Sequence, residues 1–246
     1  MNIPFEPIIF NYKINIHLVL EYLAFFLAFR YYVFLRKNSV DLIPKTNRLS
    51  IILGATLGAF LGSRIMAVLE NPVFITDISS IITILNSKTI MGGLFGGLLG
   101  VELAKKIIGE KQSSGDLFVF PIILGIFIGR IGCFLSGVKE FTYGKETTFF
   151  LGMNLGDGLK RHPIALYELI FLIILFYFLR NLKKRNLKNG LLFQYFMICY
   201  FAFRFCIEFL KPNLFFVFGL SSIQILCLIC LLYYYKTILK LFKNAS

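Results

Sequence analysis

The chain has 246 residues, of which 57% are hydrophobic and only 16% are charged. A soluble domain carries about 45–50% apolar and about 25% charged residues, so this composition excludes an ordinary soluble globular protein. The net charge of +13 is compatible with either a nucleic acid or a membrane surface as a partner. The placement of the charges decides between these two classes.

The apolar residues occur in blocks of about 20, which is the length of a membrane-spanning helix. Seven such blocks follow one another along the chain: Ile14–Leu35, Leu49–Leu69, Thr89–Ile108, Leu117–Gly137, Ile164–Leu179, Leu191–Leu210 and Leu220–Tyr235. The blocks are continuously apolar and lack the alternation of a transmembrane β-barrel. The sequence therefore predicts an all-α integral membrane protein, with one domain of seven transmembrane helices over residues 1–246.

Basic residues gather at alternate ends of the predicted helices. Fifteen follow the first, third, fifth and seventh helices, whereas seven lie in the four segments on the other side. Because cytoplasmic loops carry the excess of Lys and Arg, we expect the N-terminus outside, the C-terminus in the cytoplasm and an extracytoplasmic loop at residues 138–161. Basic span ends attract anionic lipid head groups, so membrane lipid is the expected partner and nucleic acid is not.

The five cysteines all lie within apolar blocks, and the chain has only two histidines, His17 and His162. None of the cysteines forms a metal-ligand spacing with a histidine. Buried cysteines ordinarily behave as small hydrophobic residues. We therefore expect no metal site and no cofactor.

Glycines recur every four residues in three of the predicted helices, at Gly54, Gly58 and Gly62, at Gly92, Gly96 and Gly100, and at Gly125 and Gly129. Small residues at this spacing let helices approach closely in lipid. Close helix packing is the first interpretation. A second interpretation concerns the glycines beside Arg130, Gly129 and Gly132, which could leave room for a lipid head group.

In the predicted orientation, ionisable or glycine-rich features of six helices fall at one depth, near the outer surface. They include His17, Glu21, Arg64, Met91, Arg130, His162, Tyr167, Glu168, Arg204 and Glu208. Charges inside a membrane usually mark function, and the arginine fork suits a phosphate group. The layer predicts a phospholipid-handling site. The alternative is that the acids only neutralise the arginines and lock the bundle.

Several short blocks resemble one known family. They are GAFLGSRI at residues 58–65, MGGLFGG at 91–97, GRIGCFLSG at 129–137, RHPIALYEL at 161–169 and FAFRFCIEFLKPN at 201–213. In this order they resemble the blocks of the prolipoprotein diacylglyceryl transferases, whose signature has the form GRIGNF-x-N-G. That family consists of seven-span enzymes of the bacterial plasma (inner) membrane.

The resemblance implies transfer of a diacylglyceryl group from phosphatidylglycerol to the lipobox cysteine thiol of a lipoprotein precursor signal sequence, with release of glycerol phosphate. It implies an active site that faces the outer leaflet. The implied catalytic residues are Arg130 at the phosphate, Arg204 oriented by Glu208, and His162 as a base. The implied substrate-binding residues are Arg64, Met91, Gly92, Gly93, Gly129, Gly132, Cys133, Gly137, Gly144, Tyr167 and Glu168.

Three departures from the family pattern leave alternatives open. Met91 stands where the family has a histidine, and Cys133 and Ser136 stand where the signature has asparagines. His162 is either a substitute base or a cap of the fifth predicted helix. Glu21 is a further candidate for the base, and Cys133 is a candidate nucleophile. The alternative functions are a divergent paralogue with another acceptor and a non-catalytic phospholipid-binding membrane protein.

Overall fold

The computed structural model describes residues 3–9, 11–39, 43–72, 77–185, 187–213 and 219–243. These residues are mostly helical, and the chain divides into two compact units. The first unit contains Met1–Val40, Gly115–Phe196 and Phe209–Pro212. The second unit contains Asp41–Ser114, Met197–Glu208 and Asn213–Ser246.

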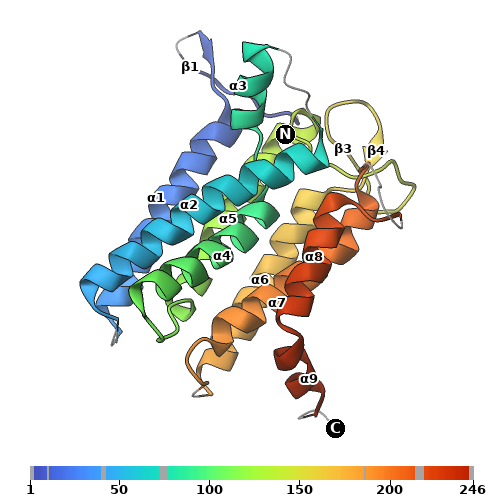
Figure 1. The fold of residues 1–246 in the computed structure, drawn as a ribbon. Coiled ribbons are helices and arrows are strands. Elements are labelled where there is room, and N and C mark those ends of the chain that lie inside the picture. The colour runs from blue at the N-terminus through green and yellow to red at the C-terminus, as the bar shows by residue number, and fades with distance from the viewer. Residues whose placement is uncertain are drawn as a thin grey trace. The chain divides into compact units, whose positions relative to one another are not determined.

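The first unit is built around α5 (Val119–Ser136), which follows a 3₁₀ turn at Asp116–Phe118. Helix α5 packs against α1 (Ile16–Lys37) and α6 (Ile164–Lys183) (Figure 1). The core of this unit is apolar, with Phe120, Ile164 and Leu172 almost fully buried. A continuous apolar block of span length thus forms each of these helices, as the sequence predicts.

Asp116 has a structural role in the first unit. Its carboxylate accepts hydrogen bonds from the backbone N–H groups of Gly190 at 2.6 Å and Phe193 at 2.9 Å. These N–H groups lie at the start of α7 (Leu191–Ile207), where backbone donors have no partner within the helix. Asp116 therefore caps α7, which is a structural role.

Short strands complete the first unit. Strands β1 (Ile8–Ile9) and β2 (Tyr12–Lys13) form one antiparallel pair, and β3 (Met153–Asn154) and β4 (Lys160–Arg161) form another. The second pair lies inside the predicted loop 138–161. Within it, Arg161 Nε donates to Asp157 Oδ2 at 2.6 Å, and this contact lowers the pKa of the Asp157 carboxyl group below its usual value.

The second unit contains a closely packed helix pair, α2 (Lys45–Glu70) and α4 (Ile90–Ile108), with the short α3 (Ile78–Asn86) between them in sequence. Glycines line this α2–α4 contact. A Cβ added to Gly54 would lie 2.6 Å from the carbonyl oxygen of Gly100. One added to Gly62 would lie 2.5 Å from that of Gly92. The packing interpretation of these glycines is confirmed.

The second unit ends with α8 (Ser222–Tyr233) and α9 (Tyr235–Lys243), which are bent by 68° relative to each other. Helix α8 begins with a capping box, in which the Ser221 hydroxyl accepts from the Gln224 N–H and the Gln224 side chain accepts from the Ser221 N–H. Such a box satisfies backbone donors at a helix start. The predicted seventh span is thus a 12-residue helix followed by a break.

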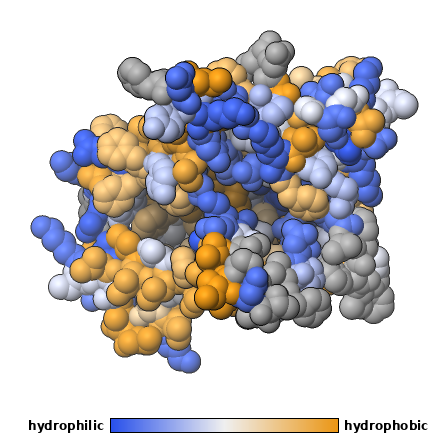
Figure 2. Space-filling model, turned by 90° about the horizontal axis from the view of Figure 1, so that it is seen from above, coloured by the Kyte–Doolittle hydropathy of each residue, from blue (hydrophilic) through white to orange (hydrophobic). Residues whose placement is uncertain are grey.

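Five helical segments of the described chain are long and apolar enough to cross a membrane, or six if the bent α8–α9 pair is one span. Helix α4 is not among the five, and it carries Glu102, Lys105 and Lys106 within its 19 residues. Figure 2 shows one face of the molecule, where hydrophilic residues lie among hydrophobic ones. The protein is an all-α, multi-pass membrane protein by these criteria, and the count of seven spans stays a prediction.

Candidate functional site

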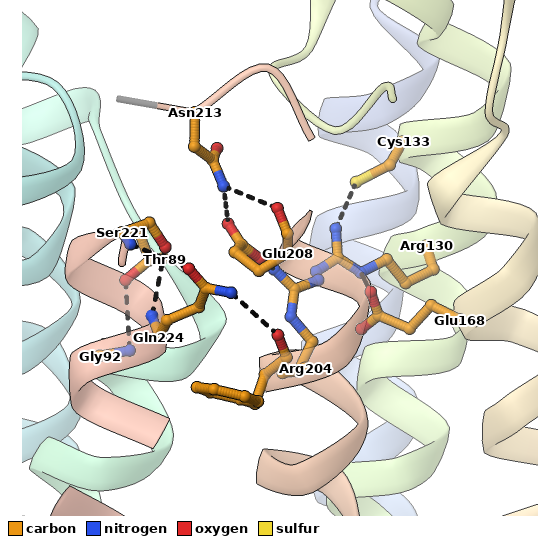
Figure 3. A network of polar contacts seen from close by, with 11 residues as sticks. Thr89, Gly92, Arg130, Cys133, Glu168, Arg204, Glu208, Asn213, Ser221 and Gln224 are labelled. Atoms are coloured by element: carbon orange, nitrogen blue, oxygen red, sulfur yellow. Dashed lines mark hydrogen bonds and ion pairs between the residues drawn. The ribbon is translucent and has the colours of Figure 1, made fainter. Parts of the chain in front are cut away.

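Arg130 forms an ion pair inside the first unit. Its Nε lies 2.9 Å from Oε2 of Glu168, which reaches it from α6 (Figure 3). Arg130 is 6% exposed and Glu168 is fully buried. Removing two charges from water costs several kcal/mol for each ion, so the pair is an expensive feature of the α5–α6 contact.

Cys133 extends this cluster toward α1. Arg130 Nη1 donates to the Cys133 sulfur at 3.8 Å, and the same sulfur lies 3.5 Å from Nε2 of His17 (Figure 3 shows the first contact). The other ring nitrogen of His17, Nδ1, lies 3.2 Å from Oε1 of Glu140. Sequence reasoning singled out Arg130, Glu168, Cys133 and His17, but it missed Glu140 and did not connect His17 with Cys133.

The glycines around Arg130 differ in their surroundings. A Cβ added to Gly132 would lie 3.2 Å from Cδ2 of His17, so Gly132 lets α1 approach α5. Nothing lies within 4 Å of a Cβ built on Gly129. Gly137 has φ = +57°, which favours glycine, and a Cβ there would collide with the Leu155 carbonyl oxygen. There is thus free space beside Gly129, whereas Gly132 and Gly137 serve packing and chain direction. Room for a lipid head group stays a prediction.

His162 lies at the start of α6, in a second polar group of the first unit. Its Nδ1 is 3.1 Å from the hydroxyl oxygen of Tyr167, and its backbone carbonyl accepts from Gly144 N–H at 2.9 Å. A Cβ on Gly144 would lie 2.5 Å from that of His162, so a side chain does not fit there. No side chain caps α6, which begins after Pro163. The side chain of His162 therefore does not cap this helix, although its backbone carbonyl accepts from the Ile164 N–H at 3.0 Å.

The second unit carries its own buried ion pair. Arg204 Nη2 donates to Glu208 Oε2 at 2.8 Å, and both residues are buried. This confirms the pairing predicted from their spacing of four residues. The Asn213 amide donates to the other carboxylate oxygen of Glu208 at 2.7 Å (Figure 3). Asn213 is a second residue that sequence reasoning missed.

Gln224 and Ser221 add a buried polar group to the same unit. The Gln224 amide donates to the carbonyl oxygen of Phe205 on α7 at 3.2 Å and so ties α8 to α7 (Figure 3). Both residues are buried. The spacing of serine and glutamine three residues apart before an apolar run is the sequence signature of a capping box, so this group was predictable.

Arg64 lies on α2 of the second unit, with its guanidinium carbon 4.6 Å from the centre of the Phe60 ring. Among the described residues, its buried Nε has no hydrogen-bond partner. Its neighbour Ser63 accepts from the backbone N–H of Thr89 at 3.1 Å, which fixes the start of α4 beside this part of α2. Arg64 and Arg204 belong to the second unit and Arg130 to the first. That the three arginines share one site therefore stays a prediction.

The MGG block begins α4 of the second unit. Met91 is 1% exposed, and Gly92 packs on Met66 and the backbone of Gly62. Thr89 caps the helix by accepting from Gly92 N–H at 3.2 Å (Figure 3). Gly93 has only distant neighbours on α2, the nearest at 3.8 Å. Met91 and Gly92 therefore lie in a packed contact.

Residues 7–239 match the sequence profile of the family described as prolipoprotein diacylglyceryl transferase. The chain belongs to this family. Among its relatives, the phosphatidylglycerol–prolipoprotein diacylglyceryl transferase of Nitratidesulfovibrio vulgaris (strain DP4) is 35% identical over 195 residues, covering 73% of this chain and 69% of the relative. The protein of the same name from Rickettsia felis is 35% identical over 200 residues, covering 74% and 73%.

The family membership confirms the resemblance drawn from the five sequence blocks. In this member of the family, the residue before the GG pair of α4 is a buried methionine, Met91. Within the described ranges, no three His, Cys, Asp or Glu residues are arranged to hold a metal ion. The polar chemistry on which a function can be built lies in the Arg130, His162, Arg204 and Arg64 groups.

Proposed function

We propose that the protein transfers a diacylglyceryl group from phosphatidylglycerol to the cysteine thiol of a prolipoprotein and releases glycerol phosphate. The observation that carries this proposal is the match over residues 7–239, together with relatives of that name at 35% identity. The reaction needs a cation at the phosphate, where negative charge develops as the bond to carbon breaks. It also needs an acceptor for the thiol proton.

Arg130 is the residue we assign to the phosphate. It is buried on α5, next to the open position at Gly129, and a guanidinium stays charged in an apolar environment. Its pairing with Glu168 fixes the guanidinium plane. An apolar contact would hold α5 and α6 together at lower cost, so the buried charge supports a functional role.

In the second unit, Arg204 and Arg64 are proposed substrate-binding residues. Arg204 is fixed by Glu208, which is itself fixed by Asn213. Arg64 has an unpartnered Nε among the described residues. Gly93 lies at the α2–α4 contact of the second unit. In the first unit, Tyr167 and Gly144 hold His162 in place. The thiol proton goes to one of the two histidines of the chain, His17 or His162.

The membrane arrangement is part of the proposal. We propose a single domain of seven spans in a bacterial plasma (inner) membrane, with the N-terminus and residues 138–161 outside and the active site facing the outer leaflet. The bias of basic residues, fifteen against seven, supports this orientation. Phosphatidylglycerol, the precursor signal sequence and the surrounding lipid are then the partners.

The test uses the full-length protein in liposomes that contain labelled phosphatidylglycerol and a lipobox peptide. We expect release of glycerol phosphate and formation of lipidated peptide in equal amounts. Arg130→Lys keeps a positive charge beside Glu168 but loses the planar fork, so turnover should fall by about 100-fold. Arg180→Lys, an exposed position in the last turn of α6, is the matched control and should leave turnover unchanged.

The outcomes separate the three candidate functions. Lipidated peptide that depends on Arg130 supports the proposal. Release of glycerol phosphate without lipidated peptide indicates a different acceptor. Binding of phosphatidylglycerol without any release indicates a non-catalytic lipid-binding protein, and equal turnover in Arg130→Lys removes Arg130 from the site.

A further inference from the structure

Four side chains of the first unit form an unbroken chain of polar contacts from the loop after α5 to the ion pair on α6. Glu140 Oε1 lies 3.2 Å from His17 Nδ1, and His17 Nε2 lies 3.5 Å from the Cys133 sulfur. Arg130 Nη1 donates to that sulfur at 3.8 Å. The order of acid, imidazole and thiol is the order found where a histidine activates a nucleophile or takes up its proton.

The position of Glu140 determines which nitrogen of His17 carries the proton. A carboxylate only accepts hydrogen bonds, so at 3.2 Å it favours the tautomer with the proton on Nδ1. The lone pair of Nε2 then faces the Cys133 sulfur and accepts its proton. The Arg130 guanidinium stabilises negative charge on the same sulfur.

The local backbone is arranged to make this contact. Gly132 precedes Cys133, and a Cβ at Gly132 would press against Cα and Cδ2 of His17 at 3.3 and 3.2 Å. Cys133 is 7% exposed, and it lines a small pocket with Tyr143, Pro163 and Ile164. The pocket volume of about 10 Å³ accommodates roughly one water molecule. The thiol is thus shielded from bulk solvent but is not sealed.

We propose that Cys133 and His17 together accept the proton of the incoming thiol, with Glu140 as the positioning residue. This assignment rests on the proposed transfer reaction. Of the two histidines in the chain, only His17 is shown in contact with both a thiol and a carboxylate, whereas the ring of His162 meets the neutral Tyr167 hydroxyl. The group also lies beside Arg130, where the phosphate is proposed to bind.

The proton moves in two coupled transfers. The S–H bond of the acceptor thiol breaks as its proton passes, through one water molecule in the small pocket, to the Cys133 sulfur, and the proton of Cys133 passes to Nε2 of His17. The acceptor thiolate then forms the C–S bond while the C–O bond to the phosphate breaks and glycerol phosphate leaves with the electron pair. The imidazolium, balanced by Glu140, returns its proton to water or to the released phosphate.

Cys133 does not carry the lipid itself in this scheme. Attack by its own sulfur would produce a thioether to Cys133, with loss of glycerol phosphate. A second thiol would then have to displace a thiolate from an unactivated carbon, and a thiolate leaves far less readily there than a phosphate ester does. Proton transfer is therefore the step that this sulfur can repeat in each cycle.

The charged groups that act on the pair come from all the surrounding elements. Glu21 on α1 and Glu140 after α5 act on His17, and Arg130 on α5 and Glu168 on α6 act on Cys133. An ordinary imidazole titrates near pH 6.5. A base must be unprotonated to act, so the transfer rate should fall as the pH is lowered through the range in which His17 is protonated.

The first experiment measures the rate of transfer in phosphatidylglycerol liposomes between pH 5 and pH 9. We expect His17→Gln to lower the rate at pH 8 by about 100-fold and to remove the low-pH ionisation from the profile. Glu140→Gln should lower the rate by a smaller factor, and Glu140→Asp should restore most of it. Cys206→Ala, an exposed cysteine on α7, is the control and should match the wild type.

Three results would overturn the assignment. One is a His17→Gln profile with the shape of the wild type at a uniformly lower rate, which indicates a structural role. Another is a pH profile of the transfer rate that loses its low-pH ionisation in His162→Gln but keeps it in His17→Gln. The third is full activity of Cys133→Asn, because an amide cannot take up the proton and the sulfur would then only fill the place of the signature asparagine.

A second experiment does not depend on turnover. Iodoacetamide is applied to the full-length protein at pH 7, and the labelling of each cysteine is followed by mass spectrometry. His17→Gln should slow the alkylation of Cys133 by about tenfold or more while leaving that of Cys206 unchanged, and equal rates would disprove the pairing. A further outcome is that Cys133 is alkylated faster in the wild type than in His17→Gln, but the wild type releases no glycerol phosphate. This outcome contradicts the proposed function and the proton-acceptor role, but not the pairing of Cys133 with His17.

Discussion

The α2–α4 contact and the α1–α5 contact are both close helix contacts that depend on glycine, yet they are built differently. Between α2 and α4, glycines face glycines, and backbone meets backbone along three successive turns. Between α1 and α5, Gly132 faces the ring of His17, and the contact continues through Cys133 to Arg130. The first contact involves no ionisable group along its glycines and serves packing, whereas the second brings ionisable groups together.

This difference shows that glycine spacing alone does not reveal what a helix contact does. In lipid, helix association depends on packing and interhelical polar contacts, because no hydrophobic force drives it. The α2–α4 pair relies on packing along its glycines, with a polar contact between Ser63 and Thr89 only at the start of α4. The α5 helix uses both, since its other side holds the buried pair of Arg130 and Glu168 with α6. Substitutions at the α2–α4 contact should therefore lower stability, whereas substitutions at the α1–α5 contact should also change the reactivity of Cys133.

The largest effect is expected for Arg130→Ala. Removing the guanidinium leaves the buried Glu168 carboxylate without its charge partner, which costs about 3–5 kcal/mol of unfolding free energy. This variant therefore tests stability more than catalysis. The protein has no tryptophan, so the midpoint of thermal unfolding in detergent is best followed by circular dichroism at 222 nm.

A companion double variant separates charge from packing at this site. Arg130→Met combined with Glu168→Leu removes both charges and should recover most of the lost stability, because a well-packed apolar pair can replace a buried ion pair. An unfolding midpoint of Arg130→Ala equal to that of the wild type would show that the carboxylate is not stabilised by this arginine.

An intermediate effect is expected for Gly58→Ala on α2. Its Cβ would lie 2.9 Å from the Cα of Gly100, and because the contact is with backbone, no side chain can move away. Overpacking of this kind costs about 1–3 kcal/mol. Gly129→Ala on α5 is the matched glycine variant. Its Cβ meets nothing within 4 Å, so it should be neutral or stabilising by up to about 1 kcal/mol. Equal destabilisation by both variants would contradict the comparison.

The helices were predictable because each apolar block is as long as the bilayer core is thick. All seven predicted blocks are helical in the structure, with bounds that differ by a few residues. The break at Tyr234 was not predictable, since no proline or glycine marks it. The two-residue strands and the nine-residue α3 were also missed, because elements this short depend on tertiary contacts more than on a local pattern.

The site was predictable only where the partners are close in sequence. Arg204 and Glu208 share a helix face, and their spacing of four residues gives the pair directly. His17 and Cys133 are 116 residues apart, and no periodicity connects them. The register of α1 against α5, set by Gly132, decides that they meet. Glu140 follows a 3₁₀ turn at Gly137–Lys139, and the direction of that turn depends on the positive φ of Gly137.

A small loss of stability, and the sharpest test of the comparison, is expected for Gly132→Ala. The added methyl group would lie 3.2 Å from the edge of the His17 ring, so the ring must shift by a few tenths of an ångström. The cost in unfolding free energy should be about 1 kcal/mol or less. In contrast, the contact from His17 to the Cys133 sulfur depends on the position of this ring, so a shift of this size weakens the transfer of a proton between them.

We therefore expect Gly132→Ala to keep its unfolding midpoint within a few degrees of the wild type while Cys133 is alkylated several-fold more slowly at pH 7. Gly129→Ala serves as the control for both measurements, because it places the same methyl group one turn earlier on α5, away from His17. If Gly132→Ala lost stability but labelled at the wild-type rate, the α1–α5 contact would be a packing device like that of α2 and α4. The difference between the two glycine contacts would then be one of composition and not of function.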